Sequence, residues 1–271
     1  MQFEGNDISV NGINTRYYEA GQPHKRAMLL LHGGFGAALL HWPGVLEHLH
    51  DYYVIAPDLP GFGGTAPLQR MTIDGLVQWA HDLLTELGLD DVIVIGNGFG
   101  GLIARLLSAE YERDVYAVVL VNGGVIPVIT PVARFVARLP LIGPNLFKRI
   151  ARRMVAKEEM TLAIQDENLL TEHFLAQLEA DVLGSARMMR AMAVSNRPTV
   201  TIPRAPTLLV WGEEDAITSR VVGEHIQKNI PESTLELIAE TRNMPHYEAP
   251  DTFCWQVTNF IKQLEGPKIP D

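Results

Sequence analysis

Short apolar runs alternate along this chain with stretches in which apolar residues recur every three or four positions. Unbroken apolar runs are typical of strands that are buried on both faces, and the intervening pattern is typical of amphipathic helices. Together they predict an α/β fold with a doubly wound, mostly parallel sheet. The runs interpreted as strands of this sheet are "AMLLLHGG", "YYVIAPDLPGFGG", "DVIVIG", "AVVLVNGG", "TLLVWG" and "TLELI".

Turn and helix signals complete the pattern. Ahead of the first run, "ISV" and "TRYYEA" predict a hairpin with "NG" at its turn. Helices are expected near 219–229 and 250–264. A further helix is predicted in "TIDGLVQWAHDLLTELGL", which ends at a glycine C-cap and carries on one face Leu76, Trp79, Ala80, Leu83 and Leu87. In such folds, ligands bind beyond the carboxyl ends of the strands.

Residues 125–203 interrupt the alternation of strands and helices. They contain no convincing strand, and "TPVARFVARLPLIGPNLFKRIARRMVAK" predicts two short amphipathic helices separated at "GPN". We therefore predict a core formed by residues 1–124 and 204–271, with residues 125–203 inserted as a helical cap.

Composition narrows the classes of protein. The chain has 271 residues, 47% of them hydrophobic, which is enough for one large core. A net charge of -10 argues against nucleic acid as the main partner, because phosphate binding requires a basic surface. No residue spacing calls for a metal or a cofactor.

The single cysteine and the N-terminus bear on the compartment. Because Cys254 is the only cysteine, the chain can form neither an intramolecular disulfide nor a cysteine-based metal site. The helical pattern around Cys254 favours a place in the core. The start "MQFEGNDISV" lacks the basic and apolar segments of a signal peptide. No apolar run reaches the ~18 residues of a membrane span. We expect a soluble, cytoplasmic protein.

Five short segments, taken in order, resemble the α/β-hydrolase superfamily, in particular its capped serine hydrolases and meta-cleavage hydrolases. They are "LLLHGGFG" for the oxyanion-hole loop, "APDLPGFGGT" for the loop after the next strand, "IGNGFGGLIA" for the nucleophile elbow, "VWGEEDAIT" for the acid and "TRNMPHYEAPDTF" for the histidine loop. The resemblance covers almost the whole chain. It implies an eight-stranded, mostly parallel sheet.

The resemblance also implies where a catalytic triad would lie. Gly96 and Gly100 match the glycines that flank the nucleophile, so Gly98 occupies the nucleophile position. The register of "MPHYEAP" places Asn243 at the histidine position. Asp215 retains the acid.

These replacements remove the usual chemistry. Gly98 supplies no nucleophile, and the neutral amide of Asn243 is not a base near pH 7. An ordinary serine-hydrolase mechanism is therefore excluded at these positions. Arg242 also departs from the family pattern, which favours natural divergence over engineered inactivation.

Other parts of the implied site remain. The N–H groups of Phe99 and Gly34 would form an oxyanion hole, which can stabilise an enolate or alkoxide without a covalent step. Asp215, no longer facing an imidazole, becomes a candidate acid or base. The alternative is a carboxylate that caps a backbone N–H group.

Several side chains are candidates for lining a ligand pocket: Phe35, His41, Trp42, His246, Met188 and Met192. For Trp42 and the methionines the alternative is core packing, and for His246 it is support of its own loop. His32 and Asp58 are interpreted as structural, the first as a support of the oxyanion loop and the second as the residue that shapes its turn.

The cap contains a basic segment. From Thr130 to Lys157 it has no acidic residue and seven basic ones: Arg134, Arg138, Lys148, Arg149, Arg152, Arg153 and Lys157. A solvated helix face is one interpretation. An anionic substrate, a carrier-protein partner or contact with an anionic membrane surface are the others.

Three functions remain open. The first is a repurposed enzyme that acts without a covalent step on a hydrophobic small molecule, by cyclisation, isomerisation, elimination or C–C bond chemistry. The second is a ligand-binding pseudoenzyme. The third is a hydrolase with an altered or inactivated mechanism. A homodimer is also left open.

Overall fold

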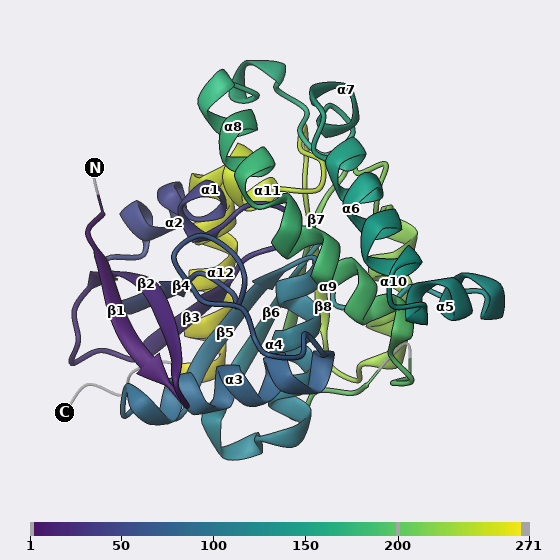
Figure 1. The fold of residues 1–271 in the computed structure, drawn as a ribbon. Coiled ribbons are helices and arrows are strands. Elements are labelled where there is room, and N and C mark those ends of the chain that lie inside the picture. The colour runs from purple at the N-terminus through teal and green to yellow at the C-terminus, as the bar shows by residue number, and fades with distance from the viewer. Residues whose placement is uncertain (1–2, 199–200, 267–271) are drawn as a thin grey trace.

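A single eight-stranded sheet organises the computed structural model, which describes residues 3–198 and 201–266 (Figure 1). The strand order is β1-β2-β4-β3-β5-β6-β7-β8, and every pair from β4 to β8 is parallel. This confirms the predicted α/β fold with its mostly parallel sheet. The strands are β1 Gly5–Val10, β2 Ile13–Gly21, β3 Ala27–Leu31, β4 Tyr53–Pro57, β5 Val92–Asn97, β6 Val115–Val121, β7 Thr207–Gly212 and β8 Thr234–Ile238.

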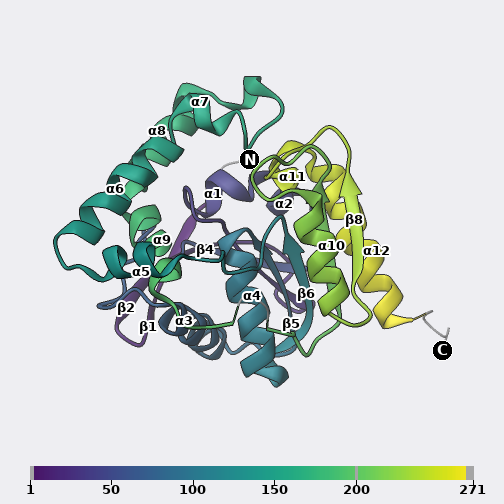
Figure 2. The same cartoon turned by 90° about the vertical axis from the view of Figure 1, so that its right-hand side faces the viewer.

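Helices cover both faces of the sheet (Figures 1 and 2). In the core they are α1 Ala38–His41, α2 Pro43–His48, α3 Ile73–Glu86, α4 Phe99–Glu110, α10 Arg220–Asn229, α11 Pro245–Glu248 and α12 Pro250–Glu265, with a short 3₁₀ helix at Glu112–Asp114. Between β6 and β7 the described residues form α5 Pro131–Arg138, α6 Ile142–Met154, α7 Lys157–Met160, α8 Glu172–Ala180, α9 Val182–Val194 and a 3₁₀ turn at Glu167–Leu169.

Alternate strand residues build two separate cores. In β5, Val92 and Val94 pack with α3 and α4, whereas Ile93 and Ile95 pack on the opposite face with α2 and α12. All four side chains are fully buried. Because successive side chains of a strand point to opposite faces, an unbroken apolar run is required where both faces are covered.

The opening hairpin and α3 follow their sequence signals. Asn11 and Gly12 form the turn between β1 and β2 with φ of 48° and 81°, the left-handed angles that an Asn-Gly turn supplies. The Thr72 side chain accepts a hydrogen bond from the Gly75 N–H at 3.0 Å and so caps α3. Leu87, predicted within the helix, is its C-terminal cap.

The break between the first two cap helices lies earlier than predicted. It falls at residues 139–141, and "GPN" belongs to the first turn of α6. The predicted break at "GPN" was therefore wrong. Leu139 precedes Pro140 and is extended, with ψ of 127°, because a following proline disfavours the helical conformation. Pro144 is tolerated because the first turn of a helix has no N–H partner to lose.

The helices between β6 and β7 stand over the carboxyl ends of the strands (Figures 1 and 2). Helices α6, α7 and α8 arch away from the sheet, and α5 projects from the body of the molecule. No strand occurs between Asn122 and Pro206 in the part of this segment that the structure describes. The division into a core and a cap at residues 125–203 stays our prediction.

Helix α4 approaches the sheet without intervening side chains. A Cβ on Gly100 would lie 2.1 Å from the backbone oxygen of Leu31, and one on Gly96 would lie 2.3 Å from the backbone carbon of Gly100. Backbone atoms cannot give way as a side chain can. The glycines therefore allow the N-terminus of α4 to rest directly on β3 and β5.

Gly100→Ala should lower the free energy of unfolding by about 3 kcal/mol, because the added methyl group forces two backbone segments apart. Urea denaturation measures the loss. Gly88→Ala is the control, since Gly88 has φ of 66° but no atom near its Cβ position, and it should lose only about 1–2 kcal/mol. Equal losses in the two variants would contradict the close contact.

Candidate active site

An apolar cavity of about 470 Å³ lies between the carboxyl ends of the central strands and the cap helices. We call it the site cavity. Its core side includes Gly34, Phe35, Gly98, Phe99 and Asn243. Its cap side is rich in unbranched and branched apolar side chains, namely Met154, Met160, Leu162, Leu178, Met188, Met189 and Met192. Flexible methionines make such a wall adaptable to ligand shape.

Gly98 is at the apex of the turn between β5 and α4. Its φ of 51° and ψ of -107° are angles that a residue with a side chain adopts only under strain. The Gly98 N–H donates to the Val121 oxygen at 2.8 Å, and its oxygen accepts from the Gly124 N–H at 3.0 Å. Apart from Gly98 and its two chain neighbours, no heavy atom of the described residues lies within 4 Å of the position that a Cβ would take. The turn is thus held firmly and leaves open space at its apex.

Two backbone donors border that space. Phe99 is the first residue of α4, where N–H groups lack helical partners and the helix dipole is positive. Gly34 lies across from it, since a Cβ on Gly34 would be 4.0 Å from the Phe99 Cβ. Neither N–H donates to an acceptor within residues 3–198 and 201–266. Both residues line the site cavity.

Asp215 lies behind the cavity wall rather than in it. Its side chain is 5% exposed, and it is absent from the cavity lining. Oδ2 accepts hydrogen bonds from the side-chain amides of Asn122 at 2.7 Å and Asn243 at 2.9 Å, and Oδ1 accepts from the Ile217 N–H at 2.8 Å. The carboxylate therefore fixes two asparagine side chains and a backbone loop.

Two asparagines at this site were missed in the sequence analysis. Asn97 ends β5, and its Nδ2 donates to the backbone oxygen of Asn243 at 3.0 Å. Asn122 follows β6 and accepts the Gly212 N–H at 3.0 Å through Oδ1. Both border the site cavity and are almost fully buried. Their positions at the carboxyl ends of central strands were the signal that could have identified them.

The loop that carries Asn243 is tied to the cap. The Asn243 N–H donates to the Ala163 oxygen at 2.9 Å. Glu248, on α11, accepts from the Arg242 N–H at 2.7 Å and from the Gln165 N–H at 2.5 Å. The Arg242 guanidinium also donates to the Thr161 oxygen. This cap–loop junction positions the amide that faces the cavity.

Three buried histidines lie beneath the site cavity. The Leu59 N–H donates to Nε2 of His32 at 2.8 Å, so the proton of this ring is on Nδ1, which donates to the Gly33 oxygen at 2.8 Å. His41 contacts the Phe35 oxygen through Nε2 at 2.7 Å. Burial lowers the pKa of His32 to about 3 and that of His41 to about 4.

Of the candidates His41, Trp42 and His246, only His41 borders the site cavity. Trp42 and His246 are 0% exposed and pack against each other with ring centroids 4.2 Å apart. His246 also stacks on His41 at 5.6 Å, and neither of its ring nitrogens has a partner among the described residues. Burial lowers the pKa of His246 well below its ordinary value. Trp42 and His246 therefore pack in the core and lie outside the lining of the site cavity, and a part for them in ligand binding stays a prediction.

Asp58 has the structural position expected from the sequence. Its carboxylate accepts from the Ala38 N–H at 3.0 Å and the Gly64 N–H at 2.9 Å, which joins two loops. Of the remaining predicted pocket residues, Phe35, Met188 and Met192 line the site cavity. Their contribution to ligand binding stays a prediction.

The sequence matches the model described as "Alpha/beta hydrolase family" over residues 28–254. The chain belongs to the alpha/beta hydrolase family. The match includes nearly all of β3, the strands β4 to β8, the turn at Gly98 and the loop of Asn243, whereas β1 and β2 precede it.

Relatives of this alpha/beta hydrolase family member include "Uncharacterized hydrolase YugF" of Bacillus subtilis (strain 168), which is 24% identical over 94% of this chain and 97% of that protein. "Epoxide hydrolase 4" of Homo sapiens is 25% identical over 94% of this chain and 78% of that protein. A solved structure of a thermophilic esterase from Thermogutta terrifontis has a TM-score of 0.80 at 20% identity, over 97% of this chain and 100% of that one. This last likeness shows the fold alone.

Two features are absent from the described residues. No helix among them has the length and apolar character needed to span a bilayer. No group of three or more His, Cys, Asp or Glu side chains in this part of the chain is arranged to hold a metal ion.

The buried histidines predict acid sensitivity. Each has a folded-state pKa below its ordinary value, so the unfolded chain binds the extra proton as pH falls below about 6.5. Stability is therefore complete above that pH and should fall below it. The expected slope is about 1.4 kcal/mol per pH unit for each histidine. His246→Phe should lower the pH slope of the free energy of unfolding by the contribution of one histidine. Urea denaturation between pH 7 and pH 5.5 measures this change.

His24→Ala, at an exposed position, is the matched control and should leave the slope unchanged. Asp58 acts in the opposite direction, because burial raises its pKa to about 6. The measured quantity is therefore the difference between each variant and the parent chain. An unaltered slope in His246→Phe would mean that this ring accepts a proton in the folded state.

Proposed function

We propose that this protein is an enzyme that polarises a carbonyl group of a hydrophobic small molecule and promotes a cyclisation or isomerisation without a covalent intermediate. The observation that carries the proposal is a pair of N–H groups, on Phe99 and Gly34, that border the apolar cavity and have no acceptor among the described residues. Donors held in place before reaction stabilise a developing oxyanion, and they do so more strongly in an apolar site.

The absence of a nucleophile at the turn leaves room for the ligand. The open space above Gly98, where a serine oxygen would otherwise stand, can receive the ligand carbonyl. Its oxygen would lie between the two N–H donors. A rearrangement within one molecule needs no attacking group from the protein, so the polarised carbonyl is sufficient to lower its barrier.

The asparagines supply orientation. Asp215 holds Nδ2 of Asn243, and no donor to Asn243 Oδ1 is found among the described residues. That oxygen is available to accept a hydrogen bond from a hydroxyl or amine of the ligand. In this proposal Asp215 is a positioning residue, because all three of its hydrogen-bond donors are protein groups and it does not border the cavity.

A ligand-binding protein is the second candidate. It is favoured because the ionisable side chains that border the cavity are poorly suited to act as a general base. Glu159 is paired with Arg153 at 3.1 Å, and the pKa of His41 is lowered to about 4 by burial. Neither is placed as a free base. Polarisation without proton transfer and simple binding therefore have to be separated by experiment.

The decisive experiment is mass spectrometry of ligands before and after incubation with the protein. Compounds are those that co-purify with the chain, supplemented by apolar carbonyl compounds that raise its melting temperature. A product of unchanged mass but altered retention supports cyclisation or isomerisation. Recovery of the unchanged ligand supports the binding protein. A product that has gained water would establish a hydrolase and overturn the proposal.

Gly34→Pro should reduce turnover by about 10²–10³-fold, because proline removes the N–H donor. Gly34→Ala is its matched control. It retains the N–H, and its methyl group would meet Met188 Sδ at an ordinary 3.4 Å. Circular dichroism checks that both variants fold. Comparable turnover in the two variants would contradict a role for this donor.

The assigned triad positions predict the result of a restoration. Gly98→Ser with Asn243→His should create a serine that reacts with a fluorophosphonate probe, because the imidazole would take over the 2.9 Å contact to Asp215. The parent chain should not react. The serine at φ of 51° should also lower stability by about 1–3 kcal/mol.

Adding Asp215→Asn to this double variant is the control, and it should sharply slow labelling by removing the group that orients the imidazole. Labelling of the parent chain would place an active serine elsewhere. A folded double variant that does not react with the fluorophosphonate probe would contradict the positions assigned to Gly98 and Asn243.

A further inference from the structure

The region around α5 and the start of α6 exposes large apolar side chains. Helix α5 projects from the body of the molecule (Figures 1 and 2). The apolar side chains along this projection, with their exposed fractions, are Val128 at 88%, Val132 at 73%, Phe135 at 65%, Leu141 at 79%, Ile142 at 56% and Leu146 at 39%. We call these six residues the apolar tip. Exposed apolar groups at this density indicate an interaction surface.

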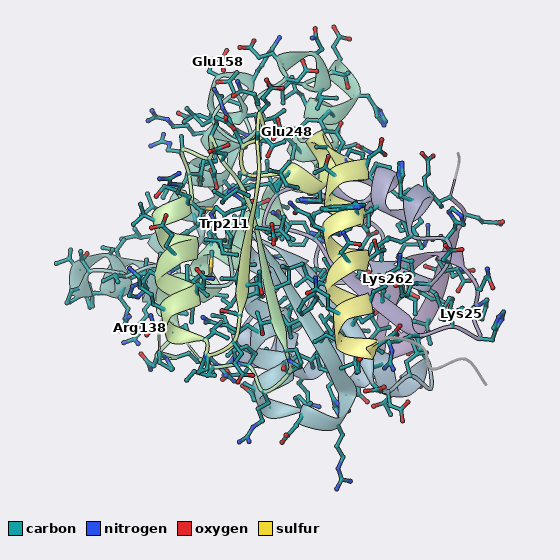
Figure 3. The ribbon with its side chains drawn as sticks, turned by 180° about the vertical axis from the view of Figure 1, so that it is seen from behind. Lys25, Arg138, Glu158, Trp211, Glu248 and Lys262 are labelled. Atoms are coloured by element: carbon teal, nitrogen blue, oxygen red, sulfur yellow. The ribbon has the colours of Figure 1, made fainter. Side chains whose placement is uncertain are left out.

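A basic groove of about 990 Å³ adjoins the apolar tip. It is bordered by the end of α5, by α6 and α9, and by the loop before α3. Five basic side chains and no acidic one line it: Arg70, Arg138, Lys148, Arg187 and Arg190. Arg138 is labelled near α5 in Figure 3. Asn145 borders both this groove and the small hollow formed by Leu141, Ile142 and Leu146, so the two features are continuous.

The basic side chains of the groove lack acidic partners among the described residues. In the described part of the chain, none of the five basic residues forms an ion pair. By contrast, Arg152 pairs with Glu179 and Arg153 with Glu159 further along α6. In a chain of net charge -10, an unpaired basic groove beside exposed apolar groups demands a partner that is both anionic and apolar.

We propose that the apolar tip and the basic groove dock on the surface of an anionic phospholipid bilayer. The phosphates and anionic headgroups would lie against the basic groove, and the apolar tip would enter the boundary between headgroups and acyl chains. Neither half of the surface alone gives stable attachment, but the two signals together do.

The shape of this surface favours a bilayer over an acidic protein. The apolar side chains lie along the projecting helix α5, the loops on either side of it and the start of α6, and the hollow that Leu141, Ile142 and Leu146 line is open to solvent. A fluid bilayer can accept a projecting apolar tip without a complementary cavity. The acidic remainder of the protein would be repelled by anionic lipid, which would orient the molecule with α5 toward the membrane.

Docking there would place the site cavity close to the bilayer. Val125 and Pro127, just before the apolar tip, border the site cavity, as does Met154 at the end of α6. A hydrophobic ligand dissolved in the membrane would then have a short path to the cavity. The docking proposal rests on the surface alone and holds whether or not the proposed reaction is correct.

Co-sedimentation with lipid vesicles tests the proposal. The full chain is mixed with vesicles of phosphatidylcholine alone or of phosphatidylcholine with phosphatidylserine. We expect binding only to the phosphatidylserine vesicles, and we expect it to weaken as salt is raised, because salt screens the attraction. Failure to bind phosphatidylserine vesicles at low salt would overturn the proposal.

Two sets of variants locate the contact. Arg138→Gln with Lys148→Gln and Arg187→Gln should weaken binding about 100-fold, given the contribution of each basic residue near an anionic surface. The matched control neutralises three basic residues elsewhere, namely Lys25→Gln, Arg113→Gln and Lys228→Gln, and should bind as the parent does. An equal loss in the two triple variants would indicate a general charge effect and overturn the assigned surface.

A fluorescent probe tests insertion of the apolar tip. Phe135→Cys offers an exposed thiol for an environment-sensitive dye, whereas Cys254 is buried and its pKa is raised to about 12 by burial, which keeps it unreactive. A blue shift on adding phosphatidylserine vesicles supports insertion. No shift at a dye on residue 135, despite vesicle binding, would overturn it, as would self-association of the parent chain that hides this tip from lipid.

Discussion

The site depends on direct contact between the backbone of one helix and the backbone of the sheet. Gly96, Gly100 and Gly123 are positions where a Cβ would lie 2.1–2.3 Å from backbone atoms of neighbouring segments. Their absence of side chains lets the first turn of α4 lie against the ends of three parallel strands. Because of this contact, the Phe99 N–H reaches the cavity floor and Gly98 can hold its turn at a positive φ. A site made of main-chain donors requires this closeness, which side chains would prevent.

The amino-acid pattern was sufficient to predict the strands of the sheet. It was not sufficient to identify the side chains that meet at the cavity. Runs such as "DVIVIG" are buried on both faces, so their hydrophobicity alone identifies them. The position of Asn122 beside Asp215 depends instead on two strands, β6 and β7, whose residues are 93 positions apart at this contact. A local sequence pattern carries no information about a contact between residues that far apart in the chain. Trp42 was ambiguous for a related reason, since an aromatic ring after a strand can face either the ligand or the core, and tertiary packing decides which.

Asp215 organises the polar groups behind the cavity as a hydrogen-bond acceptor. In a triad, a carboxylate orients an imidazole and stabilises its positive charge. Here the facing group is the Asn243 amide, which is neutral, and Asn122 provides a second amide donor on the same oxygen. The carboxylate thus organises two neutral side chains through a single oxygen.

The junction between the cap and the loop of Asn243 restricts how a ligand can reach the cavity. The cap residues 161–165 and the loop residues 242–248 share hydrogen bonds that include the one from Asn243 itself. Raising the cap at this junction would break the hydrogen bond from the Asn243 N–H and draw its amide away from the cavity. Val125, Pro127 and Met154 border the cavity away from these hydrogen bonds, so a ligand that enters beside them would leave the junction intact.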